Sequence, residues 1–247
     1  MFGYLPKTER NNIKFFFETN YLYHEKGKIN WGVLNTVEKL SKSIRLNRVD
    51  PYSKIERLKK EKQSTGNYYL NFVNGTLYIR LADFFDIDKI NDRIIRGSEK
   101  KIILNLSENS GGSVQEMLKL AKLLVSDRVK LCLKYKSHVH VYDIPENSLA
   151  QGKELFILTS KDTVSSAEIL AFVIKEGNKS SILVGEKTFG KGEGQVTLTS
   201  RKYNYRFSLT AFEWTINGLN CKELQRKYEK FFDNRVFELS MYMDKLM

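Results

Sequence analysis

The spacing of apolar side chains changes near residue 66. Before that point apolar residues recur at helical spacing, as in the group Trp31, Val33, Leu34, Val37 and Leu40. Pro51 suits the first turn of a further helix, and the charged run 54–63 suits the solvated face of that helix. We therefore predict a helical region over residues 1–66.

After residue 66, short apolar runs alternate with helical patterns. The pair Asn74-Gly75 lies between two aromatic-rich runs and predicts a tight hairpin turn, because both of its central residues need a positive φ. Later runs typical of strands cover 100–106, 129–135, 138–144, 154–160, 180–186, 195–200 and 205–214. Patterns typical of helices cover 86–96, 114–125, 167–177 and 221–247. This alternation predicts the α/β class, with a layered core around a mixed sheet.

The patterns divide the chain into three parts. They are the helical region over 1–66, an α/β core over 67–220, and a C-terminal helix over 221–247 that packs on the core. With 247 residues, 41% of them hydrophobic, the chain can bury a sizeable core. No apolar run approaches the ~20 residues that cross a bilayer, and the N-terminus has no apolar signal core. We therefore expect a protein without a membrane span that is cytoplasmic, or extracytoplasmic if a signal segment has been removed.

The chain is strongly basic, with a formal net charge of +12. Residues 1–66 hold 14 Lys and Arg against 7 Asp and Glu, so much of the excess is local. A basic charge permits nucleic-acid binding, but the sequence has no reader motif, and we do not expect a nucleic-acid partner. Cys132 and Cys221 suit two reduced thiols. His138 and His140 share one face of a strand without a third ligand nearby, so we expect no metal and no cofactor.

Two segments could carry chemistry, and a third could assist them. Ser165 and Ser166 lie where an apolar strand gives way to a helix, and a helix N-terminus can hold a nucleophile and an oxyanion donor together. The alternative is an ordinary serine cap. Lys191 is surrounded by three glycines in FGKGEGQ, which suggests tight turns that could desolvate its amine. A lysine is a general base only when neutral, and desolvation favours that form. The alternative is a lysine at the tip of a surface hairpin.

The third segment is the Gly111-Gly112 pair, which follows the strand predicted at 100–106. Glycines there let backbone N–H groups approach a ligand closely, as an oxyanion hole requires. The alternative is a plain loop before a helix.

These three segments, taken in order, resemble the C-terminal processing (tail-specific) serine peptidase family. Residues 100–125 are similar to its strand, Asn-x-Gly-Gly loop and helix. Residues 154–174 are similar to its nucleophile segment, and 182–196 (ILVGEKTFGKGEGQV) to its base segment. The resemblance covers about 68–220 and implies a layered core of ClpP/crotonase-like ββα units. It also implies an endopeptidase that binds a polypeptide in extended form, as an added strand.

The resemblance assigns roles to individual residues. The family's nucleophile precedes a Glu by three positions, which maps it to Ser165, with Ser166 as the neighbouring alternative. Lys191 would be the general base, and Gln195 would hold the lysine amine by a hydrogen bond. Backbone amides of Gly111 or Gly112 and of Ser166 would form the oxyanion hole. The implied chemistry is an acyl-enzyme mechanism with a Ser/Lys dyad.

The chain also departs from the family's pattern. Asn105, Ser107 and Ser110 stand where the family has an acidic residue, an Arg and a Pro, and Thr163-Val164 replaces a Ser/Ala stretch. These changes concern the shape of the substrate cleft. Residues 64–76 leave no room for the peptide-binding PDZ domain that many members carry, so we expect a minimal member. The helices over 1–66 could form a homodimer arm. A catalytically weak peptide-binding or scaffold protein on the same fold is the alternative function.

Overall fold

The computed structural model describes residues 4–23, 29–31, 34–46, 50–58, 68–84 and 87–229. The chain forms two compact units. Unit 1 consists of Met1–Gln63, Leu133–His140 and Glu193–Glu213, and unit 2 consists of Ser64–Cys132, Val141–Gly192 and Trp214–Met247. Unit 1 therefore combines the N-terminal region with two later segments of the chain. The three parts predicted from the sequence stay a prediction.

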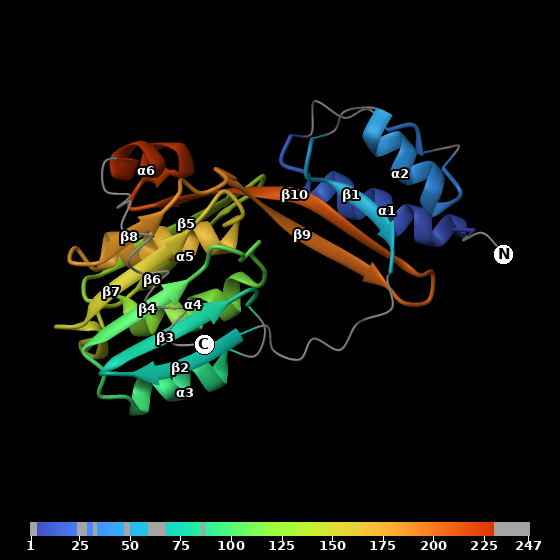
Figure 1. Ribbon diagram of the computed structural model, residues 1–247. Helices are drawn as coiled ribbons and strands as arrows, with labels where there is room; N and C mark the ends of the chain where they lie inside the picture. Colours follow the sequence, from blue (N-terminus) through green and yellow to red (C-terminus); the bar gives the residue numbers. More distant parts are fainter. Residues whose placement is uncertain are drawn as a thin grey trace. The chain divides into compact units, whose positions relative to one another are not determined.

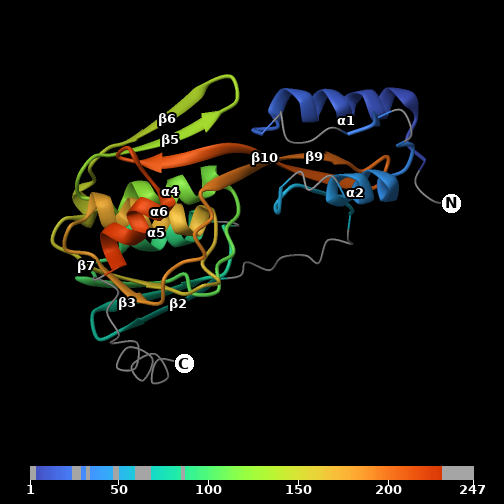
Figure 2. The same cartoon turned by 90° about the horizontal axis from the view of Figure 1, so that it is seen from above.

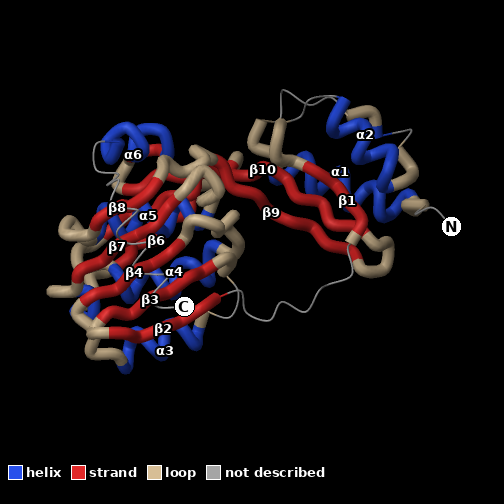
Figure 3. The backbone as a smooth tube through the Cα atoms, viewed as in Figure 1, coloured by secondary structure: helices blue, strands red, loops and turns tan. Residues whose placement is uncertain are grey.

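Unit 1 packs two helices against antiparallel strands. Figure 3 distinguishes these helices and strands by colour. The elements are α1 (Lys7–Asn20), α2 (Val37–Leu46), β1 (Lys54–Arg57), β9 (Glu193–Ser200) and most of β10 (Tyr205–Ile216). Its buried cluster draws on both helices and on β1 and β10: Leu5, Ile13, Phe17, Tyr21, Ile29, Leu34, Val37, Leu40, Ile44, Ile55, Tyr205, Phe207 and Leu209.

The helix predicted over 54–63 is wrong where the structure describes it. Lys54–Arg57 is strand β1, which pairs antiparallel with β10 and sets Ile55 opposite Phe207. Ile55 is 1% exposed, and burial of this side chain outweighs the helical preference of its charged neighbours. No helix starts at Pro51 either, because Asp50 Oδ1 accepts the N–H groups of Tyr52 (2.8 Å) and Ser53 (2.7 Å) in a turn. Residues 59–67 lie outside the described residues.

Unit 2 contains a five-stranded mixed sheet with the order β2-β3-β4-β7-β8 (Figure 1). Strands β2 and β3 form an antiparallel hairpin, and β3, β4, β7 and β8 run parallel. The predicted turn is confirmed, since Asn74 and Gly75 have φ values of 49° and 76°. The strands are β2 (Tyr68–Val73), β3 (Thr76–Leu81), β4 (Lys101–Asn105), β7 (Glu154–Thr159) and β8 (Ile182–Gly185).

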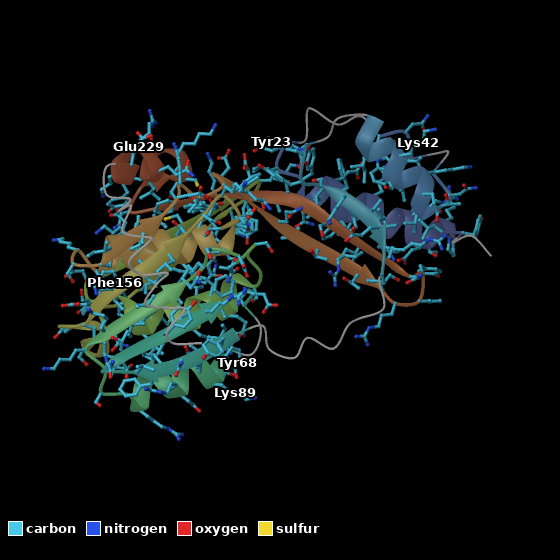
Figure 4. The ribbon with its side chains drawn as sticks, viewed as in Figure 1. Tyr23, Lys42, Tyr68, Lys89, Phe156 and Glu229 are labelled. Atoms are coloured by element: carbon cyan, nitrogen blue, oxygen red, sulfur yellow. The ribbon has the colours of Figure 1, made fainter. Side chains whose placement is uncertain are left out.

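Helices α4 (Val114–Leu124) and α5 (Ser166–Gly177) cover one face of this sheet (Figure 2). Helix α3 (Asp88–Arg96) packs beside α4. Ten of the twelve residues of α5 are buried, so α5 is enclosed on all sides, which its nearly continuous apolar sequence requires. On the other face, Phe156 of β7 packs with the buried side chains of Tyr78, Ile103, Leu158 and Val184 (Figure 4). Parallel strands β4 and β7 end at the same edge, so the loops that follow them meet there.

A second sheet has the order β1-β10-β5-β6, with β9 and β11 also paired to β10. Its further strands are β5 (Val129–Tyr135), β6 (Val139–Ile144) and β11 (Leu219–Asn220), and a 3₁₀ turn covers Ser148–Ala150. The C-terminal helix is confirmed as α6 over Cys221–Tyr228. The rest of the segment predicted as helix, 230–247, lies outside the described residues. None of the described helices is long and apolar enough to cross a membrane.

Candidate active site

Ser165 stands at a sharp turn between β7 and α5. It is the N-cap of α5 and has φ 60° and ψ −124°, a conformation that is rare for a residue with a Cβ. Holding a non-glycine residue there costs about 1–3 kcal/mol, and such strain is concentrated at functional sites. The Ser165 N–H donates to Glu168 Oε2 at 2.8 Å, which ties the turn to the first turn of the helix.

The two neighbouring serines have different surroundings. Ser166 is 1% exposed, and its hydroxyl donates to the Gly112 carbonyl at 3.1 Å. Ser165 is only half-buried. The Ser166 hydroxyl therefore joins the first residue of α5 to the Gly112 loop, while Ser165 is the more accessible of the two serines.

The glycine loop packs directly on the nucleophile segment. A Cβ on Gly111 would lie 2.9 Å from the Val164 carbonyl oxygen and 3.0 Å from Ser165 Cβ, and Gly111 has φ 102°. Buried Asn109 organises the loop: its Oδ1 accepts the Gly111 N–H at 2.8 Å, and its carbonyl accepts the Val164 N–H at 3.0 Å. Because the Gly111 N–H already has an acceptor, Gly112 is the better of the two amides predicted for the oxyanion hole.

Lys191 lies in the irregular segment between β8 and β9. It is 7% exposed, and its N–H donates to Glu168 Oε2 at 3.0 Å. The preceding Gly190 donates its N–H to Glu168 Oε1 at 2.6 Å, and the Lys191 carbonyl accepts Trp214 Nε1–H at 3.0 Å. The sequence alternative of an exposed hairpin tip is therefore wrong, because this lysine is buried.

One carboxylate oxygen thus joins the two predicted segments of the dyad. Glu168 Oε2 accepts N–H groups from both Ser165 and Lys191, and the whole residue is buried. Burial raises the pKa of the Glu168 carboxyl, and the hydrogen bonds that it accepts oppose this rise. From the sequence, Glu168 only locates the nucleophile, and its bonds to the lysine segment are not predicted. The signal was present, since a Ser followed by a Glu three positions later is typical of a capping box.

Gln195 belongs to unit 1, on β9 opposite Thr210. Its Nε2 donates to the Tyr52 carbonyl at 2.6 Å, in the turn that follows Asp50. That it also holds the Lys191 amine stays a prediction.

Two of the departures from the family's pattern, Asn105 and Ser107, belong to a neutral hydrogen-bond network. Asn105 Nδ2 donates to the Tyr78 hydroxyl at 2.9 Å, and Asn105 Oδ1 accepts the N–H (2.9 Å) and the hydroxyl (2.7 Å) of Ser107. An exposed ion pair between Arg80 and Glu108 lies close enough to act electrostatically on Tyr78. The loop after β4 is therefore held by amide and hydroxyl groups where the family has an acid and an Arg.

No group of three His, Cys, Asp or Glu side chains in the described part of the chain is arranged to hold a metal ion. His138 instead stacks on Tyr135, with ring centroids 4.6 Å apart.

The fold is of the layered α/β class in which loops after neighbouring parallel strands share one site. The family model described as "Peptidase family S41" matches residues 75–225, more than half of the chain. The chain therefore belongs to peptidase family S41. This result confirms the resemblance to the C-terminal processing peptidases and the expected fold class.

Two curated relatives and one solved structure show how far the similarity extends. The chain is 36% identical over 104 residues to "Carboxyl-terminal-processing peptidase 2, chloroplastic" of Arabidopsis thaliana, covering 41% of this chain and 20% of the relative. It is 28% identical over 184 residues to the "Probable CtpA-like serine protease" of Staphylococcus aureus (strain COL), covering 70% and 34%. The chain thus spans about a third or less of the length of these relatives. A lipoprotein from Streptococcus agalactiae shares the fold, with a TM-score of 0.63 and 16% identity. The match covers 90% of this chain and 94% of the lipoprotein chain.

Proposed function

We propose that this protein is a serine endopeptidase that cleaves polypeptides through Ser165 and Lys191. The observation that carries the proposal is the shared carboxylate oxygen of Glu168, which accepts the backbone N–H groups of both residues at 2.8 and 3.0 Å. Membership of a peptidase family and the strained, half-buried Ser165 support the same conclusion.

In the proposed reaction Lys191 acts as the general base. Its amine must be neutral to take a proton, and burial of the residue, which is 7% exposed, favours the neutral form. The Ser165 hydroxyl gives its proton to this amine while its oxygen attacks the peptide carbonyl. The lysine then protonates the leaving amine, and water hydrolyses the acyl-enzyme. Gln195 would hold the lysine amine during these steps.

The developing oxyanion would be stabilised by backbone N–H groups of Gly112 and Ser166. Ser166 is the first residue of α5, where N–H groups lack helical acceptors and the dipole of the helix favours negative charge. The Ser166 hydroxyl fixes the Gly112 loop against this helix end. Removing one such donor typically costs about 100- to 1,000-fold in kcat.

The substrate would be a polypeptide bound in extended form, as an added strand at an edge of the core. The names of the curated relatives, a carboxyl-terminal-processing peptidase and a CtpA-like serine protease, favour this class of substrate. A homodimer formed through the helices of 1–66 and a cytoplasmic location stay predictions.

The test is cleavage of an unfolded protein mixture, with the products read by mass spectrometry. Wild type is compared with Ser165→Ala and with the matched control Ser166→Ala. The proposal predicts new peptide ends with wild type and Ser166→Ala and none with Ser165→Ala. Loss of products only in Ser166→Ala would move the nucleophile by one residue. No cleavage by a folded wild type would favour the peptide-binding alternative.

A further inference from the structure

Helix α6 supplies a second support for the segment that carries Lys191. Gln225, on the buried face of this helix, donates from Nε2 to the carbonyl oxygen of Thr188 (2.8 Å) and to its Oγ1 (2.9 Å). Both residues are 5% exposed. An amide that serves the backbone and the hydroxyl of one residue fixes both the position and the rotamer of that residue.

The hydrogen bonds from Gln225 also determine the direction in which the Thr188 hydroxyl donates its proton. The oxygen of Thr188 already accepts from Gln225, and the side chain makes a second hydrogen bond with Glu168. An ionised carboxylate can only accept, so Thr188 is the donor in that bond. The bond lowers the pKa of Glu168 and so opposes the effect of burial.

The packing of α6 leaves the loop little freedom. Gly190 has φ 92°, and a Cβ built there would lie 3.3 Å from the Gln225 amide. Cys221, at the start of α6, places its Sγ 3.6 Å from Glu168 Oε1 and is 1% exposed. The helix therefore contacts both the loop and the carboxylate that joins the two segments.

We propose that Gln225 and Thr188 are positioning residues for the peptidase reaction. Gln225 orients the Thr188 hydroxyl, and that hydroxyl holds the Glu168 carboxylate where it binds the Ser165 and Lys191 segments. Both residues act through Glu168 and are assigned no contact with the reacting atoms. The proposal rests on the proposed function.

The titratable groups at Glu168 come from two segments. The Cys221 thiol faces Oε1 from α6, and Lys191 contributes its backbone N–H to Oε2. The other partners are backbone N–H groups and the Thr188 hydroxyl. Loss of the hydroxyl donor removes an interaction with the ionised form, so the pKa of Glu168 should rise. The acid limb of the activity profile should then move to higher pH.

The test compares Thr188→Val, which removes only the hydroxyl, with Gln225→Met, which keeps the approximate volume and removes both donors. We expect each variant to lower kcat/KM about tenfold or more. We also expect each variant to move the acid limb of the pH profile of kcat/KM to higher pH. Thr188→Ser, which restores a hydroxyl, should return the limb toward its wild-type position. Leu224→Ala, on the same helix, should lower thermal stability without moving the limb.

A double variant separates a relay from two independent effects. If Gln225 acts through Thr188, the acid limb of the double variant Thr188→Val/Gln225→Met lies at the same pH as the acid limb of Thr188→Val alone. Limbs that stay at the wild-type position in both single variants, or shifts that add in the double variant, overturn the proposal.

A second readout needs no activity. The backbone amide shifts of Gly190 and Lys191, followed by NMR against pH, report the ionisation of Glu168. Their midpoint should rise in Thr188→Val and Gln225→Met, and an unchanged midpoint overturns the proposal. A wild type that cleaves nothing counts against the proposed peptidase and favours the peptide-binding alternative. The NMR midpoints then still decide whether Gln225 and Thr188 hold the Glu168 carboxylate in place.

Discussion

Glu168→Gln is the substitution that isolates the carboxylate at the centre of the site. The side chain keeps its size, but one acceptor oxygen becomes an NH₂ group. If the remaining oxygen occupies the Oε2 position, it still accepts from Ser165 and Lys191, and the new NH₂ group faces the Gly190 N–H that lies 2.6 Å from Oε1. One backbone donor then loses its acceptor.

The magnitude follows from these three bonds. Hydrogen bonds to a charged group contribute about 1.5–3 kcal/mol each and neutral ones about 0.5–1.5, while a buried donor left unsatisfied costs about 1–3 kcal/mol. Against this loss, the neutral amide avoids the cost of burying a charge, which raises the pKa of Glu168 in the native protein. We expect a net destabilisation of about 1–3 kcal/mol. Activity should fall further, about 100-fold, because a displacement of ~1 Å between reacting groups costs that much.

The assay pairs urea denaturation with kcat/KM on a substrate found by mass spectrometry. The matched control is Glu99→Gln, a second buried carboxylate, which is held by Arg93 and Lys153 in the same unit. This control should lose stability and keep its activity. A folded Glu168→Gln enzyme within threefold of the wild-type kcat/KM would refute the reasoning.

Three further predictions follow from single contacts. Gly111→Ala should lower kcat/KM at least tenfold, because the new Cβ meets the Val164 carbonyl at 2.9 Å; unchanged kinetics would contradict that packing. Ile55→Ala should cost about 2–5 kcal/mol of unfolding free energy in urea, whereas a residue on an exposed helix would lose less than about 1 kcal/mol. Burial raises the pKa of the Glu168 carboxyl in the native protein. The contribution of this carboxyl to stability is therefore present below the ordinary carboxyl pKa and is lost as pH rises through the pKa of the native protein. The stability advantage of wild type over Glu168→Gln should therefore be larger at about pH 4 than at about pH 7, and an advantage independent of pH would contradict this sign.

Local signals predicted most of unit 2. The hairpin at Asn74 and Gly75 follows from the positive φ that those two residues tolerate, and the strand at 101–105 follows from a short apolar run. The helix predicted over Lys54–Arg57 is wrong because this segment pairs with Phe207 and the neighbouring residues of β10, about 150 residues away in sequence. A four-residue segment rich in charge has no local mark that distinguishes such a strand from a helix.

The candidate site was only partly predictable for the same reason. Ser165 and Lys191 could be predicted as candidates because short motifs surround them. The bonds that join their segments run through Glu168, which lies three residues from the serine but 23 from the lysine. Gln225 carried no signal at all, because its bonds to Thr188 arise only from the packing of α6.

The central claim is that Ser165 and Lys191 act together in peptide-bond cleavage. The most direct measurement is kcat/KM for wild type, Ser165→Ala, Lys191→Ala and the double variant on one identified substrate, with folding checked by circular dichroism. We expect each single variant to lose about 1,000-fold or more of kcat/KM, and the double variant to be no worse than either, because the effects of residues in one catalytic unit are not additive. Single variants that keep more than about a tenth of the activity, or losses that multiply in the double variant, would contradict the claim.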